Sequence, residues 1–126
     1  MKMILVANEH LATSLKQSLA AYFPENDIAA IDFCYPDHTV GTRKLATVIM
    51  DALEKNPAES FVILADAFAS TAFNETRLLL ARTNLSDRSV VITGMNLPLA
   101  MKYYGLKDSV PVSYLRSLNE EETLAG

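Results

Sequence analysis

The chain is poor in several residue types that mark particular kinds of protein. It has one cysteine, Cys34, among 126 residues, so no intrachain disulfide can form, which suits a reducing compartment. Its 11 lysine and arginine residues are outnumbered by 15 aspartate and glutamate residues. This balance argues against a nucleic-acid partner, because such binding needs a basic surface that displaces counterions from phosphates. No apolar run approaches the roughly 18–20 residues that span a bilayer.

Glycine is also scarce, with four residues in the chain. Neither the Gly-x4-Gly-Lys-Ser/Thr loop nor the Gly-x-Gly-x-x-Gly fingerprint is present, which argues against nucleotide binding through a glycine-rich loop. Histidine, cysteine and carboxylate residues show no dense ligand spacing. We therefore expect neither a cofactor nor a metal site.

What the chain does contain is a regular alternation of apolar runs and helix-period segments. The predicted strands are residues 3–7, 28–33, 61–65 and 89–93. The predicted helices are residues 11–22, 45–53, 73–82 and 97–104. Asn8 is the expected N-cap of the first helix, and Gly105 is expected to end the fourth. Residues 110–115 are a possible fifth strand, at an edge because Pro111 is tolerated only there.

This alternation predicts an α/β fold, doubly wound in three layers, with residues 1–126 forming a single domain. Strand–helix–strand units give a mainly parallel sheet with right-handed crossovers. We expect the common order 2-1-3-4 plus the possible edge strand. In such a sheet ligands bind beyond the carboxyl ends of the strands, where the order reverses. That point lies between the first and third strands, next to Asn8 and Asp66.

Asp66 is the sharpest functional signal, because it directly follows a run of apolar residues at the mouth of a central strand. A carboxylate there is costly to desolvate without a partner. It is either a structural acceptor for loop amide groups, or a group that orients a histidine or binds a cation.

The two histidines, His10 and His38, both follow predicted strands on this edge. His10 is either a nucleophile or proton shuttle, or an exposed polar residue at a helix start. For His38 the exposed role is preferred, and a metal site formed by both histidines with Asp66 has little support. Ser70 and Thr71 precede the third helix, where they either bind an anion or simply cap the helix.

Three segments resemble a known family. Residues 30–33 read Ala-Ile-Asp-Phe, residues 62–74 run from Val-Ile-Leu-Ala-Asp to Ser-Thr-Ala-Phe-Asn, and residues 90–98 end in Gly-Met-Asn-Leu-Pro. They are similar in order and spacing to the Asp-Phe, Leu-Val-Asp-x-Phe-Gly-Gly-Ser-Pro-Phe-Asn and Val-x-Gly-x-Asn-Leu-Pro patterns of one family. It is the enzyme IIA (EIIA) domain of the mannose/fructose/sorbose class of the bacterial sugar phosphotransferase system (PTS).

The resemblance implies a cytoplasmic homodimer, often with an exchanged edge strand, and peripheral at most to a membrane permease. It implies a phosphocarrier whose histidine takes phosphate from the histidine-containing phosphocarrier protein and passes it to enzyme IIB. The family's orienting aspartate corresponds to Asp66. In this role a carboxylate fixes the imidazole tautomer and raises its nucleophilicity.

The sequence departs from the family at the first loop, which in the family reads Ser-His-Gly-x-Leu-Ala. Without a gap, Asn8 takes the histidine position and His10 falls two residues later. In the later loop Ala69 and Ser70 replace both glycines, which restricts the backbone, while Thr71 keeps a hydroxyl at the serine position. After Tyr104 there is little room for the family's last helix.

Three hypotheses follow. In the first, His10 is the phosphoacceptor, with Asp66 as its partner and with Asn8, Ser70 and Thr71 near the phosphate. In the second, the chain is a catalytically silent relative that keeps the fold and the dimer for binding or regulation. The third, a response-regulator receiver domain, is disfavoured because Asn8-Glu9 is a poor acidic pair for Mg²⁺ and no lysine ends a fifth strand.

Overall fold

A parallel sheet forms the centre of the protein. The computed structural model describes residues 1–125, with side chains up to residue 120. Within this range the strands are β1 (Lys2–Asn8), β2 (Ala29–Phe33), β3 (Phe61–Ala65) and β4 (Ser89–Ile92). The helices are α1 (Leu11–Leu19), α2 (Thr39–Lys55), α3 (Thr71–Arg82), α4 (Leu97–Leu106) and α5 (Val112–Ala125), with a short 3-10 helix, η1 (Ser86–Arg88). The strand order is β2-β1-β3-β4 with parallel pairing throughout, as predicted.

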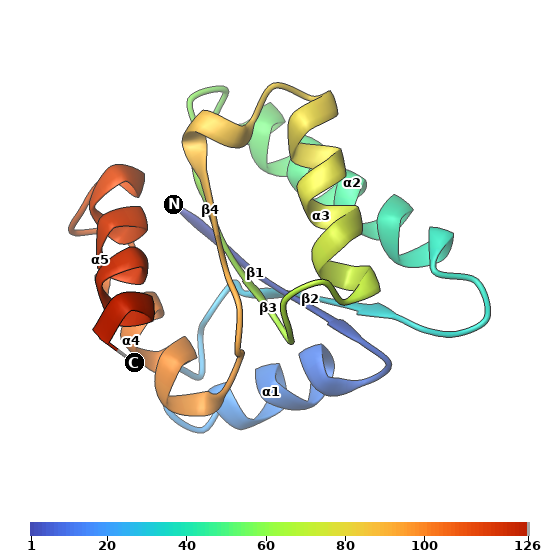
Figure 1. Cartoon of the computed structure of the whole chain (residues 1–126), viewed down its shortest axis with the longest axis horizontal. Helices are drawn as coiled ribbons and strands as arrows, with labels where there is room; N and C mark the ends of the chain where they lie inside the picture. Colours follow the sequence, from blue (N-terminus) through green and yellow to red (C-terminus); the bar gives the residue numbers. More distant parts are fainter. Residues whose placement is uncertain (126) are drawn as a thin grey trace.

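Two helical layers cover the faces of this sheet (Figure 1). Helices α2 and α3 lie on one face, and α1, α4 and α5 lie on the other. Strand β1 supplies both cores by alternation: Leu5 packs in the cluster that includes α1, α4 and α5, and Ile4 packs in the cluster that includes α2 and α3. The predicted three-layer, doubly wound architecture is confirmed.

The central strands bring the candidate residues to one edge of the sheet. Residues 3–7 and the whole of β3 are buried, as expected of strands covered on both sides. Val6 is in register with Ala65, and the Asp66 amide continues the ladder by donating to the Val6 carbonyl at 3.2 Å. The residues that follow β1 and β3 therefore leave the sheet side by side.

The predicted edge strand at residues 110–115 is wrong, because this segment begins α5. Pro111 directly precedes Val112, the first helical residue, where a missing N–H costs nothing and the fixed φ suits a helix start. Val112 and Leu115 are buried, and Leu118 packs against the same cluster. This i, i+3, i+6 spacing is helical, so the chain has room for a last helix after Tyr104.

Two helix ends also differ from prediction. Asn8 is the last residue of β1 rather than the N-cap of α1, and His10 holds the N-cap position without a side-chain capping bond. Gly105 lies inside α4, which continues to Leu106. The longest described helix, α2, has 17 residues, and none of the described helices is long and apolar enough to cross a membrane.

Helix α2 crosses β2 at a glycine whose lack of a side chain is required by the packing. A Cβ atom on Gly41 would lie 2.7 Å from Phe33 Cδ2 and 2.8 Å from Cγ. Phe33 is 2% exposed, so its ring has little space to move. We expect Gly41→Ala to lower the free energy of unfolding by about 1–3 kcal/mol, measured by urea denaturation.

Gly105 provides the matched control for this substitution. It also lies within a helix, but a Cβ atom there meets nothing within 4 Å. Gly105→Ala should therefore raise the free energy of unfolding by about 0.5–1 kcal/mol, through helix propensity alone. Equal effects from the two substitutions would show that the contact with Phe33 does not limit the packing of α2.

Candidate functional site

The candidate site lies beyond the carboxyl ends of β1 and β3, where α3 begins. Asn8 ends β1, Asp66 directly follows β3, and Ser70 precedes Thr71 at the start of α3. In Figure 1 the loop after β3 turns back into α3 beside the end of β1. The structure thus brings together four of the five predicted site residues and places the fifth, His10, separately.

Both oxygens of the Asp66 carboxylate accept hydrogen bonds from neighbouring loops. Oδ2 accepts from the Asn8 backbone N–H at 2.9 Å. Oδ1 accepts from the Ala67 N–H at 2.9 Å and from the Ser70 hydroxyl at 2.7 Å. None of these donors belongs to His10. Asp66 joins the end of β1 to the loop before α3, which is the structural role considered for it from the sequence.

The Asn8 side chain points to the N-terminus of α3. Its Oδ1 accepts a hydrogen bond from the Ala72 backbone N–H at 3.0 Å. Ala72 lies in the first turn of α3, whose amide groups have no partner within the helix. The residue expected to cap α1 instead satisfies a free amide of α3, 64 residues away in the chain.

Ser70 is the N-cap of α3, so the capping alternative is the one observed. Its hydroxyl accepts from the Phe73 N–H at 3.1 Å while it donates to Asp66. Thr71 lines a hollow of about 150 Å³ at this edge. The other lining residues are Asn8, Glu9, Phe33, Tyr35, Pro36 and His38.

His10 lies outside this network and pairs with a carboxylate that the sequence analysis did not single out. Its side chain is 77% exposed, and Nδ1 lies 3.6 Å from Asp32 Oδ2. Asp32 is held in turn by the Thr13 hydroxyl at 2.7 Å and the Thr13 N–H at 3.3 Å. Asp32 was visible in the sequence as part of the family-like Asp-Phe pair, but its contact with His10 depends on how α1 begins.

His38 is likewise not part of the Asp66 network. It is partly exposed, and its Nε2 lies 3.6 Å from Glu75 Oε1 on α3. The Thr42 hydroxyl donates to the other oxygen of Glu75 at 3.3 Å. Because each histidine faces a different carboxylate, the metal site considered from His10, His38 and Asp66 is not formed among the described residues.

Two residues of this edge adopt left-handed backbone conformations that favour glycine. Glu9 has φ 58° and Ala69 has φ 64°. The family resemblance implies a glycine of the first loop at the first of these positions and one of the Gly-Gly pair at the second. Both positions carry side chains here, in a backbone conformation that glycine adopts without strain.

Sequence reasoning gave Glu9 and Cys34 no part in the site, yet they lie next to each other. The Cys34 thiol is 3.9 Å from the Glu9 carbonyl oxygen, and Glu9 Oε1 accepts from the Tyr35 N–H at 2.9 Å. Burial raises the pKa of the Cys34 thiol, and the nearby carboxylates of Glu9 and Asp32 raise it further. The pairing of β1 with β2 brings Glu9 and Cys34 together, and no local sequence motif predicts this contact.

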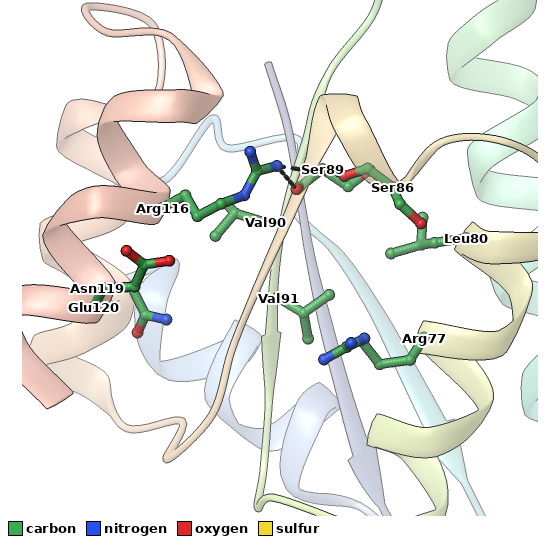
Figure 2. Close-up of a pocket in the computed structure, with 9 residues that line it drawn as sticks. All are labelled: Arg77, Leu80, Ser86, Ser89, Val90, Val91, Arg116, Asn119 and Glu120. Atoms are coloured by element: carbon green, nitrogen blue, oxygen red, sulfur yellow. Dashed lines mark hydrogen bonds between the residues drawn. The ribbon is translucent and has the colours of Figure 1, made fainter.

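A second, larger hollow of about 360 Å³ lies away from this edge, along the open side of β4 (Figure 2). Arg77 on α3 and Arg116 on α5 flank it, and Val90 and Val91 of β4 line it between them. Arg116 donates to the carbonyl oxygen of Ser89 at 2.7 Å. The hollow contains none of the predicted site residues.

Comparisons with known proteins agree with this fold. The chain is 29% identical over 126 residues to the "PTS system sorbose-specific EIIA component" of Lacticaseibacillus casei, covering 96% of this chain and 87% of that protein. The mannose/sorbose-specific IIA subunit from Enterococcus faecalis matches with a TM-score of 0.77 and 22% identity, covering 95% of this chain and 86% of that one. The PTS IIA protein associated with the fucose utilization operon of Streptococcus pneumoniae matches with a TM-score of 0.69 and 16% identity, covering 97% and 91%.

The family comparison extends over nearly the same length. The family described as "EIIA-man: PTS system fructose IIA component" matches residues 2–115, from the start of β1 into the first turn of α5. This range contains Asn8, His10 and Asp66 together with the whole sheet. The chain therefore belongs to the mannose-type EIIA family of the sugar phosphotransferase system.

Proposed function

We propose that this EIIA-family chain serves a sugar phosphotransferase system as a binding or regulatory module that carries no phosphoryl group at position 8. The observation that carries the proposal is the Asn8 side chain, which bonds to the Ala72 N–H at 3.0 Å; by the family resemblance, without a gap, Asn8 stands at the histidine position. A carboxamide nitrogen lacks the available lone pair with which an imidazole accepts a phosphoryl group. The chemistry of the family is therefore missing at this position.

The contacts around Asp66 support the same proposal. Oδ1 of Asp66 accepts two hydrogen bonds and Oδ2 accepts one, all three come from the chain itself, and none comes from an imidazole. At the N-terminus of α3, where phosphate oxygens could bind, the Ala72 and Phe73 amides already donate to Asn8 and to the Ser70 hydroxyl. These side chains bond to one another and to the start of α3, and none of them carries the imidazole nitrogen that would accept a phosphoryl group.

The partners proposed for this module are those that the family resemblance implies. We propose that the chain docks on the histidine phosphocarrier protein or on enzyme IIB in the cytoplasm, as a homodimer. An exchanged edge strand needs an open sheet edge, and the outer side of β4 offers one next to the hollow in Figure 2. Among the described residues there is no fifth strand that could be exchanged across this edge.

Phosphorylation in vitro tests the proposal. The wild-type chain is incubated with phosphoenolpyruvate, enzyme I and the histidine phosphocarrier protein, and acid-labile phosphate on the chain is measured. We expect no label above background, while calorimetry detects binding to the phosphocarrier or to enzyme IIB. Stoichiometric label on the wild-type chain would overturn the proposal of a silent module.

A second candidate function, a phosphocarrier that uses His10, is favoured by one observation. His10 Nδ1 faces Asp32 at 3.6 Å, and the imidazole is 77% exposed, so Nε2 is accessible to a partner protein. In this scheme the Nε2 lone pair attacks the phosphorus of the phosphohistidine donor, the donor's N–P bond breaks, and the donor imidazole keeps that electron pair. Asp32 would then hold the tautomer in place of Asp66.

The two candidate functions predict different phosphate labelling of the wild-type chain and of three variants. If His10 carries the phosphate, His10→Ala loses the label, whereas His38→Ala keeps it because His38 lies on a different loop and faces Glu75 of α3. Asp32→Asn would slow labelling without abolishing it. The silent module predicts background label in the wild type and in all three variants.

A further inference from the structure

Three potential metal ligands gather where β1 and β2 end. The two strands pair in parallel with Asn8 opposite Phe33, so Glu9 and His10 leave the sheet next to Cys34. The Glu9 N–H donates to the Phe33 carbonyl at 3.0 Å, which fixes this juxtaposition. One ligand atom from each of Glu9, His10 and Cys34 lies within 4.8 Å of the other two.

The chemistry of these three groups matches zinc. A carboxylate oxygen, an imidazole nitrogen and a thiolate are all ligands of tetrahedral Zn²⁺, with bonds of about 2.0–2.3 Å, which puts ligand atoms about 3.4–3.8 Å apart. The side chains would therefore move about 1 Å closer together. The Glu9 and His10 side chains are exposed, so they can rotate to make this approach. The Cys34 side chain is partly buried and would keep its position.

Two of the ligands, Glu9 and His10, have a neighbour that would orient them once they bind a metal. The Tyr35 N–H binds Oε1 of Glu9 at 2.9 Å, which leaves Oε2 for a metal. Asp32, itself anchored by Thr13, lies 3.6 Å from His10 Nδ1. A carboxylate behind a histidine ligand is a common outer partner in metal sites, where it fixes the ring and raises its basicity.

We propose that Glu9, His10 and Cys34 form a zinc site with three protein ligands and an open fourth position. The site uses none of the Asp66 network, so the proposal does not depend on the silent-module function. In a zinc site His10 and Glu9, whose backbone is left-handed, would both be ligands. Phosphate transfer at position 8 would give neither residue a role. The open position would take water or a ligand atom from a partner protein.

Zinc binding is tested on the full chain, with Zn²⁺ in competition with a chromogenic chelator. We expect one Zn²⁺ per chain, and about 100-fold or greater weakening in Cys34→Ser, His10→Gln and Glu9→Gln, since loss of a ligand costs more than loss of an outer partner. His38→Gln is the matched control and should bind like the wild type. Circular dichroism confirms that each variant is folded.

Cobalt substitution identifies the ligands directly. Co²⁺ bound through Cys34 should give a thiolate-to-metal absorption band, which disappears in Cys34→Ser. Asp32→Asn should weaken affinity by about 10–100-fold while leaving the band in place, because Asp32 positions His10 without touching the metal. A folded wild-type chain that retains no zinc, a cobalt spectrum without a thiolate band, or equal binding in all the variants would overturn the proposal.

Discussion

Asn8→His should convert the chain from background labelling to about one acid-labile phosphoryl group per chain in the presence of enzyme I and the phosphocarrier. The residue 8 side chain points to the first turn of α3, where the Ala72 N–H now bonds to the Asn8 oxygen. An imidazole there gains a nucleophilic nitrogen, and a phosphoryl group on it meets the positive end of a helix. The measurement is radiolabel retained at alkaline pH and lost in acid.

Asn8→Gln is the matched control, because it keeps an amide and adds no nucleophile, so it should stay at background. In the Asn8→His chain, His10→Ala should leave the label intact, and Asp66→Asn should slow labelling by roughly 10-fold or more, since a carboxylate partner sets the imidazole tautomer. A folded Asn8→His chain without label would mean that position 8 is not what prevents phosphorylation.

The second large effect is expected from Asp66→Asn, which should lower the free energy of unfolding by about 2–4 kcal/mol. Asp66 accepts from donors on both oxygens, at Asn8, Ala67 and Ser70. An asparagine has one acceptor oxygen, and its NH₂ group would face an N–H or a hydroxyl. Hydrogen bonds to a charged group are worth about 1.5–3 kcal/mol each, and partial exposure of the site reduces their sum.

Urea denaturation followed by circular dichroism measures this loss. Asp51→Asn removes the same charge from the exposed side of α2 and should change stability by about 0.5 kcal/mol or less. Equal free energies of unfolding for the two variants would show that the hydrogen bonds of Asp66 do not stabilise the fold.

The centre of the sheet could be predicted from the sequence because β1 and β3 are buried on both sides and read as continuous apolar runs. Residues 61–65 were predicted without error, and the strand order is the common one that was expected for a parallel sheet of this kind and that the family resemblance implied. Residues 110–115 misled because Val-Pro-Val resembles an edge strand, while the helical spacing of Val112, Leu115 and Leu118 emerges only when the segment is extended to its full length.

The sequence predicted that the candidate site lies at the edge of the sheet where β1 and β3 end, but it did not predict the hydrogen bonds among its residues. Asp66, Asn8 and Ser70 meet where the topology places them, and Ser70 caps α3 as a serine in that position often does. The separation of His10 from Asp66 could not be read from the sequence, since it depends on the left-handed turn at Glu9. That turn directs His10 to Asp32 on the neighbouring strand.

The position of β1 in the sheet has a consequence for synthesis of the chain. The first strand made is an interior one, and its partner β3 begins at Phe61. Until that segment leaves the ribosome, the edge of β1 that pairs with β3 has no hydrogen-bonding partner. Pairing of segments so far apart in sequence is slow because a long loop must close first. A nascent chain stalled before Phe61 should therefore need a chaperone, and one stalled after β3, β4, α4 and α5 have emerged should not.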